Sequence, residues 1–306
     1  MNLVTIGQAK GKQRCVISLG VGKPCFTASL SRLRQSLEHV GFEGDFLFWN
    51  RELPPGCPPH FEVPFGFKTH CFYTAKKMGY KEVLWMDSTC IAIRSLKTLF
   101  RDIIKNDYIF FNNNYDQVLG QWISDEALEQ NMLTREEAMT IPELPCSVMG
   151  LHMESTLATT FLDQWHEIMN DGITARGTRR SIKTWDEYQA IFWNRNQAAS
   201  SDPRVKGHRC DQPAAGLVAH RLGMLPYADY LRDIHYTANP INRKTAILHH
   251  REFTEDITPL KSIYHRIFFR DPWIEVPRRR LRSLGKVIRS TIKSRDFKME
   301  TKGQNS

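Results

Sequence analysis

The chain has 306 residues, of which 41% are hydrophobic and 25% are charged, and such a chain can fold around a large core without disulfide bonds. No apolar run approaches the roughly 18 residues of a membrane-spanning helix, and residues 1–13 hold no apolar signal-peptide core, so we expect a cytoplasmic protein. The net charge is +9, but residues 278–298 contribute +8 of it, which leaves the body nearly neutral and argues against nucleic-acid binding.

The seven cysteines are odd in number and scattered, and no two of them have the Cys-x-x-Cys spacing of zinc sites. Neither a zinc site nor a disulfide framework is expected. We predict reduced thiols that pack as small hydrophobic residues. The cysteines are Cys15, Cys25, Cys57, Cys71, Cys90, Cys146 and Cys210.

The first part of the chain has two short apolar runs separated by an amphipathic segment. Residues 15–20 and 46–49 are predicted to be buried strands. Residues 26–40 place their apolar side chains on one helical stripe, which Gly41 ends. This strand, helix, strand order predicts a right-handed crossover and parallel pairing. Four prolines and a glycine between residues 53 and 60 predict a loop.

A second helix and strand follow that loop. Residues 68–78 are predicted to be a helix that Gly79 ends, and residues 83–86 are an apolar run too short for a helix, so a buried strand is expected. Further strands are expected at 108–111, 147–151 and 245–248, and further helices at 134–137, 154–169, 185–193 and 211–222. In the helix at 154–169 the residues expected to face inward are Leu157, Phe161, Leu162, Trp165 and Ile168.

Asp87, Ser88 and Thr89 directly follow the predicted strand at 83–86. In open α/β sheets ligands bind at the carboxyl ends of strands, and oxygen atoms at alternate positions of an extended chain point to one side. A carboxylate in this position can hold Mg²⁺ or Mn²⁺, or accept hydrogen bonds from a ribose. The alternative is a carboxylate that caps a turn, and the spacing alone does not separate the two.

A second polar group, His208-Arg209-Cys210-Asp211-Gln212, lies at the start of a predicted helix. Asp211 suits an N-cap position, which is the simpler interpretation. An Asp beside a Gln, preceded by a His and an Arg, also suits an edge that binds an acceptor hydroxyl or a sugar.

Basic residues form a third group, in two places. Lys68 opens a predicted helix, whose N-terminus favours phosphate. His249, His250 and Arg251 follow the last predicted strand and could neutralise a diphosphate or supply an imidazole nitrogen to a metal. A solvated basic loop is the alternative for these residues.

Three stretches resemble the metal- and nucleotide-binding core of GT-A-fold glycosyltransferases, similar to family 8 and related bacterial and viral members. They are Phe67-Lys68, the segment Gly79–Thr89, and Ile91-x-Ile93-x-Ser95-Leu96. The resemblance implies an α/β fold with a Rossmann-type mixed sheet flanked by helices. It implies one domain at residues 1–277, with a nucleotide-binding half at about 12–115 and an acceptor half at about 116–277.

The implied reaction is hexosyl-type transfer of a sugar from a nucleotide-sugar to a hydroxyl of a glycan, glycolipid or glycoprotein. Asp211 and Gln212 would then act near the transferred sugar. The residues implied to bind the donor are Lys68, Asp87, Ser88, Thr89 and Arg251. Those implied to hold Mn²⁺ or Mg²⁺ are Asp87, Thr89 and His249.

The motif departs from the family because Thr89 replaces the second Asp of the Asp-x-Asp signature, so the metal loses a negative ligand. Two interpretations stay open: a metal held by Asp87, a histidine and the substrate diphosphate, or an enzyme that works without a metal. A third is a catalytically silent protein of the same fold that binds a partner or a membrane.

The segment 278–306 is a separate basic tail. Its apolar residues Leu281, Leu284, Ile288 and Ile292 follow helical spacing, with basic residues around them. This pattern indicates an amphipathic helix on an anionic membrane surface or on a partner, which would suit a lipid-linked acceptor. A solvated basic terminus is the alternative.

Overall fold

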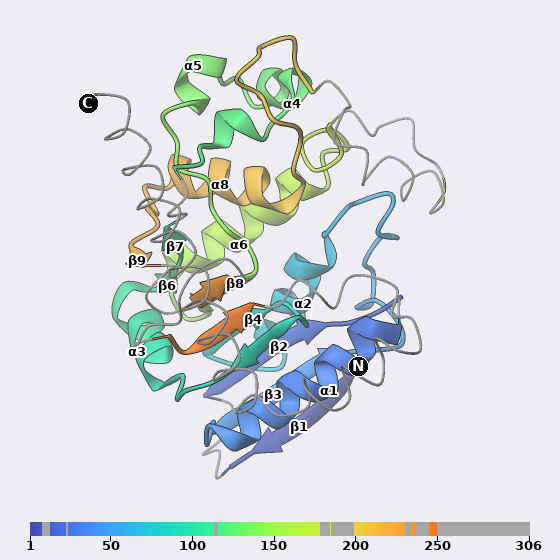
Figure 1. Ribbon diagram of the computed structural model, residues 1–306, viewed down its shortest axis with the longest axis vertical. Coiled ribbons are helices and arrows are strands. Elements are labelled where there is room, and N and C mark those ends of the chain that lie inside the picture. Colours follow the sequence, from blue (N-terminus) through green and yellow to red (C-terminus); the bar gives the residue numbers. More distant parts are fainter. Residues whose placement is uncertain are drawn as a thin grey trace, which may run out of the picture.

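The computed structural model describes residues 1–7, 13–22, 24–112, 116–177, 184, 199–229, 234–236 and 245–249. A six-stranded sheet with the order β1-β3-β2-β4-β8-β6 forms the centre of this part of the chain (Figure 1). Its strands are β1 (Asn2–Ile6), β2 (Arg14–Leu19), β3 (Gly44–Trp49), β4 (Glu82–Met86), β6 (Tyr108–Ile109) and β8 (Val148–His152). Parallel and antiparallel pairs both occur, which confirms the predicted mixed α/β sheet.

The crossover predicted near the N-terminus is present. Helix α1 (Pro24–His39) connects β2 to β3, and these two strands pair in parallel. Helix α2 (Phe67–Lys77) then leads into β4, which pairs in parallel with β2 and antiparallel with β8. All five residues of β4 are buried, as the apolar run predicted for a strand with neighbours on both sides.

Helices cover both faces of this sheet, because successive strand residues point to opposite sides. Val16, Leu84 and Met86 pack with the side chains of α1 and of α3 (Lys97–Asn106). Ile17 and Trp85 pack on the other face, against α2, α6 (Thr156–Met169) and α8 (Asp211–Arg221). Figure 1 shows α6 and α8 on the side of the sheet that leads to α4 (Asp125–Gln130) and α5 (Arg135–Ala138).

The smaller elements extend this framework. The short helix η1 (Leu119–Gln121) precedes α4, and Thr134 forms the predicted capping box with Glu137 at the start of α5. Strand β5 (Cys90–Ala92) joins a second sheet with β10 (Ile234–Tyr236) and β11 (Ile247–His249), and β7 (Phe111–Asn112) pairs with β9 (Ala228–Asp229).

Three features differ from the sequence predictions. Strand β1 pairs with the edge of the sheet at β3, although no element was expected before residue 12. The strand expected at 108–111 is divided into β6 and β7, which belong to different sheets. Leu157, expected to face inward, is 36% exposed because it lies at the edge of the buried face of α6, which consists of Ala158, Phe161, Leu162, Trp165 and Met169.

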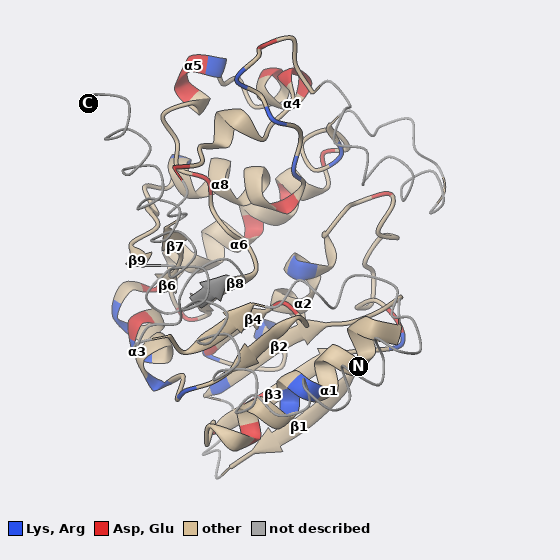
Figure 2. Ribbon diagram, viewed as in Figure 1, with Lys and Arg blue, Asp and Glu red and all other residues tan. Residues whose placement is uncertain are grey.

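Further predictions concern the cysteines, membrane-spanning helices and the distribution of charge, and some fall on residues that the structure does not describe. All seven cysteines lie in the described part and are free. None of the helices described is both long and apolar enough to cross a membrane. Figure 2 shows acidic and basic residues interspersed on α3 and α5, in keeping with a nearly neutral body. The helix expected at 185–193, His250, Arg251 and the 278–306 tail lie outside the described residues.

We predict that Gly20→Ala destabilises the protein, because a Cβ at Gly20 would lie 2.6 Å from the carbonyl oxygen of Phe26 and 2.7 Å from Cδ1 of Leu30. Helix α1 would have to move away from the end of β2, at a cost of about 1–3 kcal/mol in the free energy of unfolding. Urea denaturation measures this change.

The matched control is Gly216→Ala in α8. There a Cβ would approach only the flexible end of Leu119, at 3.2 Å, and alanine favours a helix. This variant should be as stable as the native protein or slightly more stable. Equal stability of the two variants would contradict the close approach of α1 to Gly20.

Candidate functional site

The candidate site begins at Asp87, where β4 ends. The Asp87 N–H donates to the carbonyl of Ser147 at 2.8 Å, and the Cys90 N–H donates to the carbonyl of Asp87 at 2.8 Å, so a tight turn follows the strand. The chain then leaves the main sheet as β5, which pairs antiparallel with β11 and places His249 opposite Cys90. As a result, Nε2 of His249 lies 3.8 Å from Oδ2 of Asp87.

Lys68, in the first turn of α2, joins this turn to a distant helix. Its Nζ donates to Oδ2 of Asp211 at 2.6 Å and to the carbonyl of Cys146 at 2.8 Å, and lies 3.4 Å from Oδ1 of Asp87. The side chain is 3% exposed. A single buried ammonium therefore holds together two carboxylates from different parts of the chain, and two of its three N–H groups donate to protein oxygens.

The indole of Trp85 completes the fixation of Asp87. Its Nε1–H donates to Oδ1 of Asp87 at 2.8 Å, and Nζ of Lys68 lies 5.4 Å from the centre of the indole ring. Oδ1 of Asp87 is thus held by Trp85 and Lys68, whereas Oδ2 faces His249. The Asp87 side chain is 30% exposed, so this carboxylate also reaches solvent.

The electrostatics of the site follow from this arrangement. Burial raises the pKa of Asp87, and the charge of Asp211 acts in the same direction, while Lys68 and Trp85 oppose both effects. Burial acts to lower the pKa of Lys68, but the charges of Asp211 and Asp87 outweigh it and keep this pKa above its usual value. Lys68 is therefore positively charged throughout the neutral range, and Asp87 takes up a proton at a higher pH than an exposed aspartate does.

Asp211 does not cap the helix, which corrects the simpler interpretation. The N-cap of α8 is Cys210, and Asp211 is the first helical residue, with its carboxylate bound to Lys68. Asp211 is 6% exposed, and the positive end of the helix dipole stabilises its charge. Gln212 follows it and is partly exposed.

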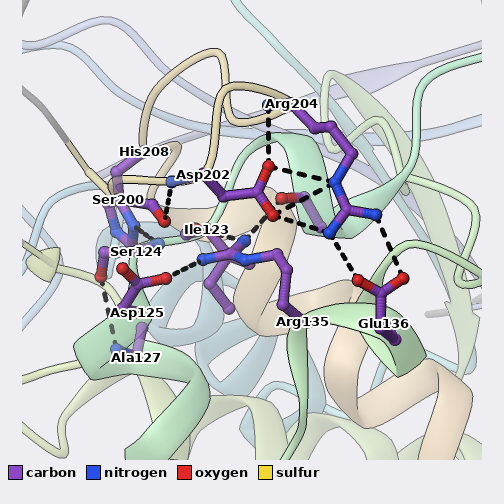
Figure 3. A network of polar contacts seen from close by, with 11 residues as sticks. Ile123, Ser124, Asp125, Ala127, Arg135, Glu136, Ser200, Asp202, Arg204 and His208 are labelled. Carbon is purple, nitrogen blue, oxygen red and sulfur yellow. Dashed lines mark hydrogen bonds and ion pairs between the residues drawn. The ribbon is translucent and has the colours of Figure 1, made fainter.

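A polar network holds the segment before Asp211 in place (Figure 3). Arg204 forms ion pairs with Asp202 and with Glu136 of α5, and Arg135 pairs with Asp125 of α4 at 2.5 Å. The Arg204–Glu136 pair attaches residues 199–209 to α5, and the Asp125 N–H, which donates to the carbonyl of Ala199 at 3.1 Å, attaches them to α4. The position of Asp211 therefore depends on elements far from Asp87 in the fold.

His208 and Arg209 make contacts within the protein. Nδ1 of His208 accepts from the Ser124 N–H at 3.0 Å. The guanidinium of Arg209 pairs with Glu143 and stacks 3.8 Å from the centre of the Trp122 ring. Both side chains hold the approach to α8.

The residues present fit a divalent ion only in part. Asp87 and His249 face each other as a carboxylate and an imidazole, but the described residues contain no group of three His, Cys, Asp or Glu side chains that could hold a metal. Ser88 and Thr89 are each 6% exposed, and the carbonyl of Thr89 accepts from Arg32 at 3.4 Å. Two protein ligands suit Mg²⁺ or Mn²⁺ when substrate phosphate oxygens complete the shell.

Sequence reasoning identified Lys68, Asp87, Asp211 and His249 separately, and the structure brings the four together. It did not identify Trp85 as a hydrogen-bond donor to Asp87, because an apolar run is the signal for a core residue. The carbonyl of Cys146 was also missed, since a backbone acceptor leaves no trace in the sequence.

We predict that Lys68→Met destabilises the protein more at pH 7.5 than at pH 5. Without the ammonium, the carboxylate of Asp87 loses the positive charge that most opposes the effect of burial, so its folded-state pKa rises further above the unfolded value. Between the unfolded and the folded pKa the native state then binds more protons than the unfolded state, so stability falls as the pH rises through this range. The loss at pH 7.5 should be about 3–5 kcal/mol, measured by urea denaturation.

Lys81→Met serves as the control for this variant. Nζ of Lys81 lies 2.9 Å from Glu154, but the two side chains are 44% and 56% exposed. Water screens such a pair, so no measurable change is expected at either pH. A Lys68→Met loss that is the same at both pH values would contradict the role of the carboxylates.

No family model matches the sequence, and no match was found among curated proteins. Among solved structures, the chain is similar to a glycosyltransferase involved in the glycosylation of the major capsid of PBCV-1, at 13% identity and a TM-score of 0.40, over 78% of this chain and 92% of that one. It is similar to mouse xyloside xylosyltransferase 1 in its apo form, at 10% identity and a TM-score of 0.46, over 80% and 99%. It is also similar to the galactosyltransferase LgtC in complex with donor and acceptor sugar analogues, at 11% identity and a TM-score of 0.40, over 78% and 87%. All three of these solved structures are of glycosyltransferases.

Proposed function

We propose that this protein is a glycosyltransferase of the GT-A type, which transfers a sugar from a nucleotide-sugar to an acceptor hydroxyl. The observation that carries this proposal is the meeting of Asp87, His249, Lys68 and Asp211 at the carboxyl end of β4. That edge of an α/β sheet is where ligands bind. Two carboxylates, an imidazole and an ammonium there suit a substrate with hydroxyls at one end and a diphosphate at the other.

Each residue then has a distinct role. Asp87 and His249 would hold a divalent ion, and Ser88 and Thr89 lie beside them in the turn. When bound, the ion supplies positive charge to the departing diphosphate. Lys68 holds both carboxylates and adds a positive charge close to that diphosphate. Arg251, two residues after His249, is expected to approach it as well.

In the reaction, the bond between the anomeric carbon and the diphosphate oxygen breaks, and the electron pair leaves with the diphosphate. The acceptor hydroxyl forms the new bond, and its proton passes to the departing diphosphate or to water. Asp211 and Gln212, at the start of α8, would contact the transferred sugar and fix its anomeric carbon against the acceptor. Lys68 contributes by fixing the carboxylate of Asp211, because a carboxylate without this partner would turn toward solvent.

The acceptor is expected to be a glycan, a glycolipid or a glycoprotein bound by the half of the chain after residue 116. The 278–306 tail would then hold the enzyme on an anionic membrane and bring it to a lipid-linked acceptor. The alternative is a catalytically silent protein of this fold, which Thr89 in place of an acidic ligand favours.

Asp87→Asn and Asp211→Asn should each lower transfer from the preferred nucleotide-sugar by at least about a hundredfold, because each removes a charge at the reacting centre. Product formation from a panel of UDP- and GDP-sugars measures this. Asp107→Asn is the control: Asp107 is 44% exposed and has a φ of 69°, which asparagine tolerates. Unchanged transfer in both site variants would refute the assignment.

Calorimetric titration with UDP and GDP, with and without Mn²⁺, separates the enzyme from the silent protein. We expect binding of one nucleotide that Mn²⁺ strengthens, and His249→Ala should remove most of that effect. Binding that Mn²⁺ does not change would point to an enzyme without a metal. No binding of any nucleotide would favour the silent protein.

The role of the tail is tested by comparing the full chain with residues 1–277. The shorter chain should bind anionic vesicles more weakly, because it lacks the basic residues of 278–298, while its hydrolysis of the nucleotide-sugar stays the same. Equal vesicle binding by the two chains would reject a membrane role.

A further inference from the structure

The rings of Phe65 and Trp85 lie 5.6 Å and 5.4 Å from Nζ of Lys68, and they belong to a larger group of aromatic side chains. The rings of His60 and Phe65 lie 4.8 Å apart, His60 stacks on Phe67 at 5.6 Å, and Phe67 lies 5.9 Å from Trp85. Trp85 is 1% exposed, whereas the other three rings are partly exposed. The aromatic cluster His60, Phe65, Phe67 and Trp85 therefore extends from the buried indole of Trp85, which binds Asp87, to partly exposed rings.

Phe65 occupies this cluster in a strained backbone conformation. Its φ is +63°, in the left-handed region that large L-residues rarely adopt. Two hydrogen bonds hold it: the Phe65 N–H donates to Nδ1 of His60 at 3.2 Å, and its carbonyl accepts from the Lys68 N–H at 3.1 Å. Glycine would adopt this conformation without strain, so the phenylalanine ring must contribute something that offsets it.

The ring of Phe65 is directed toward the charged groups of the site. Nζ of Lys68 lies 5.6 Å from its centre, and the same Nζ contacts Asp211 at 2.6 Å and Asp87 at 3.4 Å. The ring of Phe65 therefore lies close to the ammonium that joins the two carboxylates, so an apolar surface and charged groups are neighbours here. A pyranose presents hydroxyls around its edge and C–H groups on its faces, and it matches this combination of surfaces.

We propose that Phe65, supported by Phe67, binds the C–H face of the donor sugar and is a specificity-determining residue for the transferred sugar. This rests on the proposed function. The strain at Phe65 keeps the ring beside Lys68 before the donor arrives, so less conformational freedom is lost on binding. Recognition of the nucleotide itself does not depend on this ring.

The test uses Phe65→Gly, Phe65→Asn and Phe65→Tyr in the full chain. Calorimetry measures the affinity for the preferred nucleotide-sugar, chosen from UDP-glucose, UDP-galactose, UDP-xylose and GDP-mannose, and for the matching nucleoside diphosphate. Phe65→Gly and Phe65→Asn should bind the nucleotide-sugar about tenfold more weakly and the nucleoside diphosphate within about twofold of the native affinity, which is the effect of one aromatic contact. Phe65→Tyr, which keeps the ring, should bind both normally.

Stability provides a second readout that a merely structural ring would not give. Phe65→Gly should unfold at the same urea concentration as the native protein or a higher one, because glycine relieves the strain. Met132→Gly is the matched control, since Met132 also has a positive φ, of +53°, and its side chain is 92% exposed. This variant should gain stability in the same way and keep both affinities.

Three results would overturn the proposal. An equal loss of affinity for the nucleotide-sugar and for the nucleoside diphosphate would assign the ring to the base or the phosphates. No loss of either affinity would show that the ring does not contact the ligand. A marked loss of stability in Phe65→Gly would assign the ring to packing. Failure of the native protein to bind any nucleotide would refute the proposed function itself, and this measurement uses the native protein alone. The two failures are therefore distinguishable.

Discussion

The site depends on one buried cation. The ammonium of Lys68 is removed from water, and it is tolerated there because two carboxylates and a carbonyl oxygen replace its hydration. The ammonium stabilises the charged form of both carboxylates in turn, since Asp87 and Asp211 would repel each other without a positive charge between them. The three side chains therefore form one electrostatic unit, in which no member is independent of the others.

This unit also joins the central sheet and α2 to helix α8. Lys68 comes from α2 beside the parallel strands, Asp87 from the end of β4, and Asp211 from α8. Residues 199–209, which precede α8, are bound to α4 and α5. A shift of α8 relative to the sheet would separate Asp211 from Lys68 and expose an unpaired charge. If the protein has the proposed function, this arrangement would place the donor precisely between these elements, as a transfer reaction requires.

The surroundings of the unit divide the site into different surfaces. Oδ2 of Asp87 faces the imidazole of His249, a combination that suits a cation or a hydroxyl. The aromatic cluster on the other side offers an apolar surface, and Trp85 belongs to both because its ring packs with Phe67 while its N–H binds Asp87. If the protein has the proposed function, Thr89 in place of a second acidic residue weakens the side that would hold a metal, while the carboxylate, ammonium and aromatic surfaces do not depend on it.

The sequence by itself determined the strand and helix order from β2 to β4, because the periodicity of apolar residues is a local property of the chain. It also determined that Asp87 ends a buried strand and that α8 begins near residue 211. Only the tertiary structure decided what these residues contact. Asp211 suits an N-cap by local rules, yet it binds Lys68, and His249 reaches Asp87 only because β5 pairs with β11. The pairing of strand β1 was likewise decided by β3, a neighbour distant in the chain. Such pairings depend on which surfaces meet when the whole chain folds, and no local pattern records them.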